Sequence, residues 1–169
     1  PRGTAEGVPM KPEPQLIEVG RAQIVQSFAN NKKRKVALFG LGPMNAIARK
    51  AATQLAAEGF DCAVINPRFT KPIDAPAHET YGHEADLVVT IEDHVLIGGY
   101  GSAVLELFSE KNVTTPVIRI GWPDQFIEHA STQDELRKKY GLSVENVVAR
   151  VKAQFRLAPA EVKKLVAVV

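Results

Sequence analysis

Short runs of apolar residues recur along the chain, and polar stretches separate each run from the next. A run of this kind is typical of a strand that is buried on both faces of a sheet. The pattern predicts four such strands, at residues 36–39, 62–65, 87–91 and 117–120. Residues 16–25 alternate more loosely between apolar and polar side chains, which predicts one further strand at the edge of the sheet.

Apolar residues at helical spacing lie between the predicted strands. The first predicted helix follows residues 40–43, with Pro43 at a tolerated first position, and ends at Gly59, a residue type that favours helix C-termini. Further helices are predicted at residues 76–84 and 101–108. Two more follow residue 127: residues 131–134 can cap one that ends near Tyr140, and Ser143 can cap one that runs to residue 155.

Alternating strands and helices imply an α/β fold with three layers, in which helices cover both faces of a mostly parallel sheet. We expect one domain with short tails, because 169 residues with 45% hydrophobic side chains suffice for one core. Residues 1–14 carry four prolines and two glycines, which is typical of an extended linker continued from elsewhere. Residues 159–169 fit either a last helix or a frayed tail.

Residues 87–108 are the stretch around which we expect the rest to be organised. The strand in this stretch is predicted to end at Glu92 and Asp93, and open α/β sheets keep their chemistry at such strand ends. The glycines at positions 98, 99 and 101 allow a tight turn with positive φ, and Ser102 can cap the next helix. The turn could hold an anion at a helix N-terminus, but it lacks the lysine of a phosphate loop, so we prefer a purely structural turn.

Composition and charge exclude several classes of function. The balance of 21 basic and 19 acidic side chains gives a net charge of only +2, so charge alone predicts neither nucleic-acid nor membrane binding. No apolar run approaches the length that spans a membrane. Cys62 is the only cysteine and lies in an apolar run, which indicates a buried small side chain rather than a nucleophile. We expect a soluble, cytoplasmic protein.

The remaining candidate motifs do not define a reaction. Residues 40–42 (GLG) are similar to a dinucleotide fingerprint, but Asn45 takes the place of the third glycine and the next strand ends at Asn66 rather than at an acidic residue. The four histidines (His78, His83, His94 and His129) are not spaced like a metal site. A neighbouring carboxylate would favour the charged form of His94, although a surface or interface histidine is the simpler interpretation.

Several stretches, taken in order, resemble the C-terminal domain of 1-deoxy-D-xylulose-5-phosphate synthase, a transketolase-like enzyme that uses thiamine diphosphate. The stretches are residues 1–3 (PRG), 66–74 (NPRFTKPID), 90–102 (TIEDHVLIGGYGS), 120–127 (IGWPDQFI), 132–137 (TQDELR) and 140–142 (YGL). The glycine turn recurs more widely in transketolase-like domains, whereas residues 120–137 point to the synthase. His94 and Tyr100 depart from the residues that are usual in this family.

The resemblance implies a mixed five-stranded sheet whose first strand is antiparallel. It implies a linker at residues 1–14, a transketolase C-terminal-like domain at residues 15–156 and a tail or helix at residues 157–169. Arg2 matches the family's arginine that binds the phosphate of glyceraldehyde 3-phosphate, and a planar guanidinium suits that role. The resemblance assigns no catalytic, cofactor-binding or metal-binding residue to this chain.

The intact family enzyme decarboxylates pyruvate and joins the two-carbon fragment to glyceraldehyde 3-phosphate, at the entry to non-mevalonate isoprenoid, thiamine and pyridoxal synthesis. Thiamine diphosphate and magnesium are held by two earlier domains of a homodimer, so the resemblance implies that this chain alone is structural and inactive. An alternative is the assembly domain of a 2-oxo-acid dehydrogenase β subunit or of a transketolase, which would lack the synthase-like residues 122–142. A freestanding nucleotide-binding protein is a third hypothesis.

Overall fold

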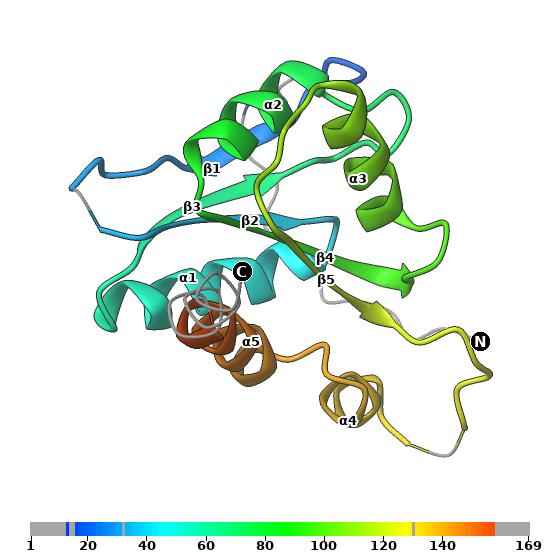
Figure 1. Ribbon diagram of the computed structural model, residues 1–169. Helices are drawn as coiled ribbons and strands as arrows, with labels where there is room; N and C mark the ends of the chain where they lie inside the picture. Colours follow the sequence, from blue (N-terminus) through cyan, green and yellow to red (C-terminus); the bar gives the residue numbers. More distant parts are fainter. Residues whose placement is uncertain (1–12, 14–15, 32, 130, 158–169) are drawn as a thin grey trace, which may run out of the picture.

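The computed structural model describes residues 13, 16–31, 33–129 and 131–157, and these residues form one mixed five-stranded sheet between two layers of helices (Figure 1). The strands follow the spatial order β1-β3-β2-β4-β5. Strand β1 pairs with β3 in the antiparallel direction, and the remaining neighbours are parallel. The strands are β1 (Gln23–Gln26), β2 (Lys35–Gly40), β3 (Asp61–Asn66), β4 (Leu87–Val95) and β5 (Val117–Trp122).

Helices α1 and α5 cover one face of the sheet, with the short α4 beside them, whereas α2 and α3 cover the other face (Figure 1). This division follows from the strand order. Because right-handed crossovers are strongly preferred, the connection from β2 to β3 and the connections from β3 to β4 and from β4 to β5 must cross opposite faces. The helices are α1 (Met44–Ala57), α2 (Ala75–Glu84), α3 (Tyr100–Glu110), α4 (Gln133–Lys139) and α5 (Val144–Leu157).

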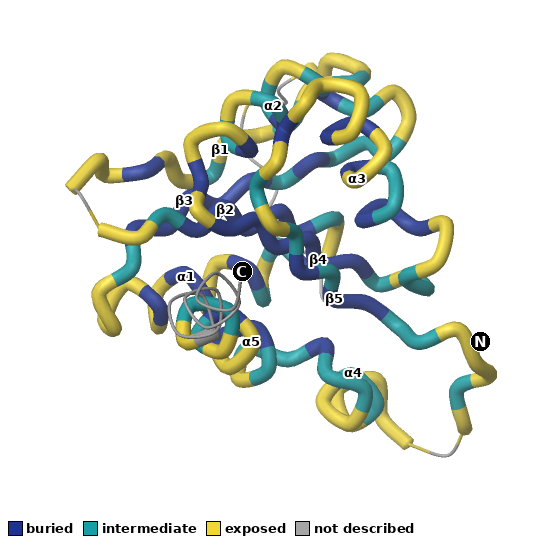
Figure 2. The backbone as a smooth tube through the Cα atoms, viewed as in Figure 1, coloured by how far each residue is buried: buried dark blue, intermediate teal, exposed yellow. Residues whose placement is uncertain are grey.

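Side chains along the central strands point alternately to the two faces of the sheet, which divides the core into two clusters. In β2, Val36 and Leu38 pack toward α1 and α5, while Ala37 and Phe39 pack toward α2 and α3. These strand positions have no exposed surface, and the buried parts of the tube in Figure 2 follow the central strands. Burial on both faces explains why these strands read in the sequence as continuous apolar runs.

The predicted fold class is confirmed, including the antiparallel first strand. The four strands predicted from apolar runs and the five helices predicted within the described residues all form, within a few residues of their expected ends. The predicted edge strand at residues 16–25 is wrong in its limits, because β1 begins only at Gln23. Gly20 has a φ of +75° and turns the chain before β1, and Leu16 is fully exposed rather than facing a core.

The predicted linker and tail lie almost wholly outside the described residues, which include only residue 13 of the first and residue 157 of the second. The structure therefore leaves the proposed domain limits as predictions. Among the helices that the structure describes, none has the length and apolar character needed to cross a membrane.

Candidate functional site at the carboxyl ends of the strands

Strand β4 extends beyond its predicted end and carries the expected acidic cluster inside the sheet. It continues to Val95, with an irregular register against β5 after Ile91. Glu92 is fully buried and Asp93 is half-buried, so these residues do not form an open polar edge. The prediction that the strand ends at these two residues and leaves them on a polar edge is corrected, because an apolar pattern cannot reveal a buried carboxylate that has hydrogen-bond partners.

The carboxylate of Glu92 caps the N-terminus of α3. The backbone N–H of Tyr100 donates to Glu92 Oε2 at 2.6 Å, and the N–H of Gly101 donates to Oε1 at 2.8 Å. The positive end of the helix dipole and two charge-assisted hydrogen bonds compensate the buried charge. The anion at this helix N-terminus is therefore supplied by the chain itself, and the structural turn that we preferred is confirmed.

The glycine turn performs a different task from the one predicted. Of the three glycines in the turn, only Gly98 has a positive φ, +71°. At Gly99 a Cβ would lie 2.2 Å from Glu92 Oε2, so a glycine is required there by close approach. The predicted cap by Ser102 is wrong: Gly99 is the N-cap residue, and the Ser102 hydroxyl donates to the carbonyl oxygen of Leu96 at 2.9 Å.

Tyr100 is buried and hydrogen-bonded to a buried histidine. His78 Nδ1 lies 2.7 Å from the carbonyl oxygen of Asp74, which can only accept, so Nδ1 carries the proton. His78 Nε2 therefore accepts from the Tyr100 hydroxyl at 2.6 Å. Burial lowers the pKa of His78, and burial followed by the charge of Glu92 raises the pKa of Tyr100. These groups form a neutral internal network behind the turn.

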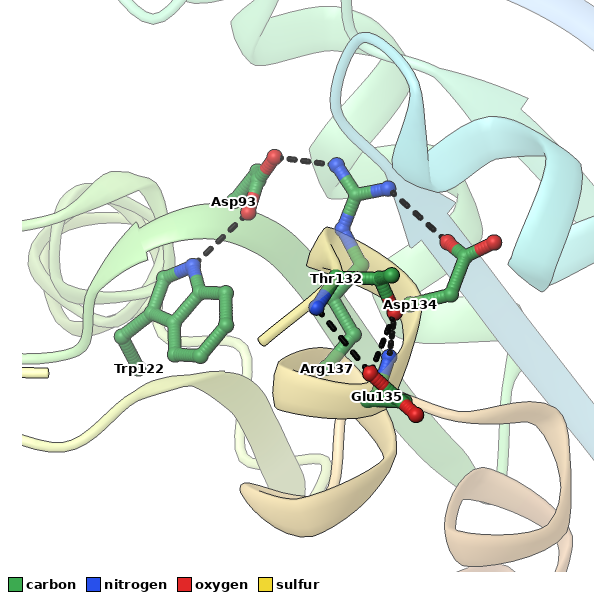
Figure 3. A network of polar contacts seen from close by, with 6 residues as sticks. All are labelled: Asp93, Trp122, Thr132, Asp134, Glu135 and Arg137. Atoms are coloured by element: carbon green, nitrogen blue, oxygen red, sulfur yellow. Dashed lines mark hydrogen bonds and ion pairs between the residues drawn. The ribbon is translucent and has the colours of Figure 1, made fainter. Parts of the chain in front are cut away.

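Asp93 joins the end of β4 to α4 and β5 (Figure 3). The Trp122 indole donates to Asp93 Oδ1 at 2.7 Å, and Arg137 Nη2 lies 2.5 Å from Oδ2. The Asp93 and Arg137 side chains are 24% and 16% exposed, so solvent screens this pair only in part. We call these three residues the Asp93 clasp. The sequence placed none of them together, because they lie on three separate elements.

The predicted cap of α4 is confirmed as a capping box (Figure 3). The Thr132 hydroxyl accepts from the Glu135 N–H at 3.3 Å, and the Glu135 carboxylate accepts from the Thr132 N–H at 3.0 Å. Contacts with Thr132 and Ser131 lower the pKa of Glu135. The capping box fixes where α4 starts and so holds Arg137 over Asp93.

The other candidate residues have separate surroundings. His94 is exposed, and its nearest hydrogen-bond partner is the carbonyl oxygen of Val95 rather than either acidic neighbour. Cys62 is buried as predicted, and burial together with the charge of Asp61 raises its pKa to about 12, so it is not a nucleophile. Arg2, the predicted phosphate ligand, lies outside the described residues.

The fold agrees with the class of domain that the sequence resembles. A mixed five-stranded sheet with an antiparallel first strand is what the resemblance to transketolase-like C-terminal domains implies. Residues 27–147 match the family described as "Transketolase, C-terminal domain". The chain belongs to this family.

Within this family, the chain is similar in sequence to 1-deoxy-D-xylulose-5-phosphate synthases, the proteins that its motifs resemble. The chain is 46% identical to 1-deoxy-D-xylulose-5-phosphate synthase of Methylacidiphilum infernorum over 148 aligned residues. The alignment covers 88% of this chain and 22% of that protein. The chain is 40% identical over 164 residues to the synthase of Acidobacterium capsulatum, with 96% and 25% covered. The predicted resemblance is confirmed, and the chain spans about a quarter of these relatives' length.

Solved structures give the same fold. A chain titled "Split gene transketolase, inactive beta4 tetramer" superimposes with a TM-score of 0.71 at 38% identity, over 81% of this chain and 43% of that one. A transketolase of Campylobacter jejuni superimposes with a TM-score of 0.54 at 16% identity, over 83% of this chain and 20% of that chain. The second likeness supports the fold alone.

Proposed function

We propose that this chain is the C-terminal domain of a 1-deoxy-D-xylulose-5-phosphate synthase. The intact enzyme would condense pyruvate with glyceraldehyde 3-phosphate, with loss of CO2, and so supply isoprenoid and thiamine synthesis. The proposal depends chiefly on identities of 46% and 40% to synthases over most of the chain. The Asp93 clasp adds support, because Trp122 and Arg137 both belong to residues 122–142, the stretch that separates the synthase from the dehydrogenase alternative.

We assign thiamine diphosphate and magnesium to the remainder of the enzyme. The carboxylates best placed at the strand ends are already used, since Glu92 caps α3 and Asp93 binds Trp122 and Arg137. Within residues 16–31, 33–129 and 131–157 no group of three or more His, Cys, Asp or Glu side chains is arranged to hold a metal ion. These described residues therefore offer no set of metal ligands.

The role proposed for this domain is structural and dimer-forming. Ile97 and Phe126, on the loops that follow β4 and β5, are 67% and 103% exposed. Exposed apolar side chains of this size are typical of surfaces that another protein surface covers. The split-gene relative, titled an inactive tetramer of β chains, suggests that such chains associate without catalysing the reaction. The buried thiol of Cys62 suits the reducing cytoplasm, where we place the enzyme.

Arg2 is the one substrate contact that we propose in this chain. Its guanidinium would pair with the phosphate of glyceraldehyde 3-phosphate through two parallel hydrogen bonds. Replacing it in the full-length enzyme by Gln should raise the KM for glyceraldehyde 3-phosphate by about tenfold and leave the KM for pyruvate unchanged. Arg21→Gln is a matched control, because Arg21 is exposed and its side chain pairs only with Glu18 among the residues that the structure describes.

The decisive experiment compares the full-length protein with residues 1–169. Both are supplied with thiamine diphosphate, Mg²⁺, pyruvate and glyceraldehyde 3-phosphate, and release of CO2 and formation of the sugar phosphate are measured. We expect turnover only by the full-length protein, and analytical ultracentrifugation of residues 1–169 should show a dimer that Phe126→Asp weakens. Turnover by residues 1–169 would refute the structural role, and a full-length protein that instead acylates lipoyl groups would favour the dehydrogenase alternative.

A further inference from the structure

A cavity of about 510 Å³ lies along the outer edge of the sheet. Strand β5 is the last strand in the sheet order, so one of its sides has no neighbouring strand. The cavity lies between this side and the segment that runs from the end of α4 into α5. Its lining includes Arg119, Gly121, Lys139, Asn146 and Arg150. Its volume is within the range of small-molecule sites, about 300–1,000 Å³.

The outer side of β5 directs backbone groups toward this cavity. The carbonyl oxygens of Pro116 and Trp122 accept hydrogen bonds from β4 and from the residue after it, so these positions face inward. Because the backbone N–H and C=O groups of successive strand residues point to opposite sides, those of Arg119 and Gly121 point outward. Arg150 Nη1 donates to the outward carbonyl oxygen of Arg119 at 2.9 Å. Within the part of the chain that the structure describes, no hydrogen bond takes up the outward N–H groups of Arg119 and Gly121, so they remain as donors along the cavity wall.

The side chains around the cavity carry an excess of positive charge. Lys139 forms an ion pair with Glu128. Among the residues described by the structure, Arg119 and Arg150 form no ion pair with a carboxylate. Arg150 is an exposed residue, and partial burial lowers the pKa of its guanidinium. An anion in the cavity would supply the negative charge that none of the described carboxylates supplies to Arg150.

We propose that this cavity binds a small phosphate-bearing anion between the outer side of β5 and α5. Arg150 pairs with the phosphate oxygens through its remaining N–H groups, Lys139 adds a second positive charge, and the N–H of Gly121 donates from the strand. Guanidinium groups match the geometry of phosphate oxygens. The cavity is largely open to solvent, and its volume is that of a small-molecule site. The proposal does not depend on the assignment to the synthase.

The test is a titration of ¹⁵N-labelled residues 1–169 with inorganic phosphate and with pyrophosphate, followed by amide chemical shifts. Ionic strength is held constant with sodium chloride. We expect saturable shifts at Gly121, Gly141 and Asn146, with pyrophosphate binding more tightly than phosphate. Arg150→Gln should weaken binding about tenfold, since it removes one charge-assisted interaction. Arg156→Gln, at an exposed residue of the same helix that does not line the cavity, should leave binding unchanged.

Three results would overturn the proposal. They are shifts that never saturate, shifts that chloride reproduces, and equal weakening by the variants at Arg150 and Arg156, which would indicate diffuse attraction to a basic surface. If Arg150→Gln fails to fold, Lys139→Gln serves instead, because the Lys139 side chain is 58% exposed. That variant should weaken binding roughly threefold, and no change in affinity would also refute the site.

Discussion

Replacing Glu92 by Gln tests whether the buried carboxylate holds the glycine turn. Gln keeps the volume of the side chain but has one oxygen where Glu92 has two, and both Glu92 oxygens accept backbone hydrogen bonds, at 2.6 and 2.8 Å. One of these N–H groups would therefore face an amide NH2 group in a site with no exposed surface. No cavity forms, so the change in stability reports the hydrogen bonds and the charge.

The magnitude follows from these contacts. An unsatisfied buried donor costs about 1–3 kcal/mol, and losing a negative charge at a helix N-terminus costs about 0.3–2 kcal/mol. We expect Glu92→Gln to lower the free energy of unfolding by about 3 kcal/mol, which for a chain of this length corresponds to a fall in Tm of roughly 6–12 °C. This is a large part of the stability of a typical domain, about 5–15 kcal/mol.

Urea unfolding followed by circular dichroism measures this effect through the midpoint and the slope. The control is Glu106→Gln, an exposed residue of α3, which should change the stability by less than about 0.5 kcal/mol. The amide proton signals of Tyr100 and Gly101 should also move upfield when the carboxylate is removed. If Glu92→Gln is as stable as the wild type, the carboxylate does not hold the turn and the reasoning is refuted.

Three further predictions follow from the structure. In a double-mutant cycle, Asp93→Asn and Arg137→Met should show a coupling of about 1–3 kcal/mol, and additive effects would contradict the Asp93 clasp. Thr132→Ala should destabilise by about 1 kcal/mol and speed amide exchange in α4, whereas Thr132→Ser should not; equal exchange in both would exclude the capping box. Because the pKa of His78 is lowered in the folded state, the unfolded state binds a proton below about pH 6.5 that the folded state does not bind. The free energy of unfolding should therefore decrease as the pH falls, by up to about 1.4 kcal/mol per pH unit. His78→Gln should flatten this slope between pH 6.5 and 5, and an unchanged slope would show that other groups cause it.

Much of the fold could be predicted because its signals are local. Four of the strands are marked by short apolar runs, and residues 131–134, which include the cap residue Thr132, are enough to predict the start of α4. The same logic failed for residues 16–22, since a loose alternation does not require pairing with a neighbouring strand. Strand β1 begins only where Gln23 can pair with Asn66 on β3.

The candidate site was harder to predict because its contacts join elements that are distant along the chain. The sequence indicated that Glu92 and Asp93 follow an apolar strand, but not that one would be buried against α3 and the other bound by Arg137, 44 residues away. The arrangement of Arg119, Lys139 and Arg150 around one cavity has the same origin.

By itself, the sequence determined the layers of this protein, because burial on both faces and helical spacing are properties of neighbouring residues. Its family followed from motifs that resemble those of known proteins. Only the tertiary structure decided what the polar groups do. A carboxylate inside a sheet is stable only where backbone N–H groups converge on it, and that convergence depends on how the strands are ordered and how α3 is docked.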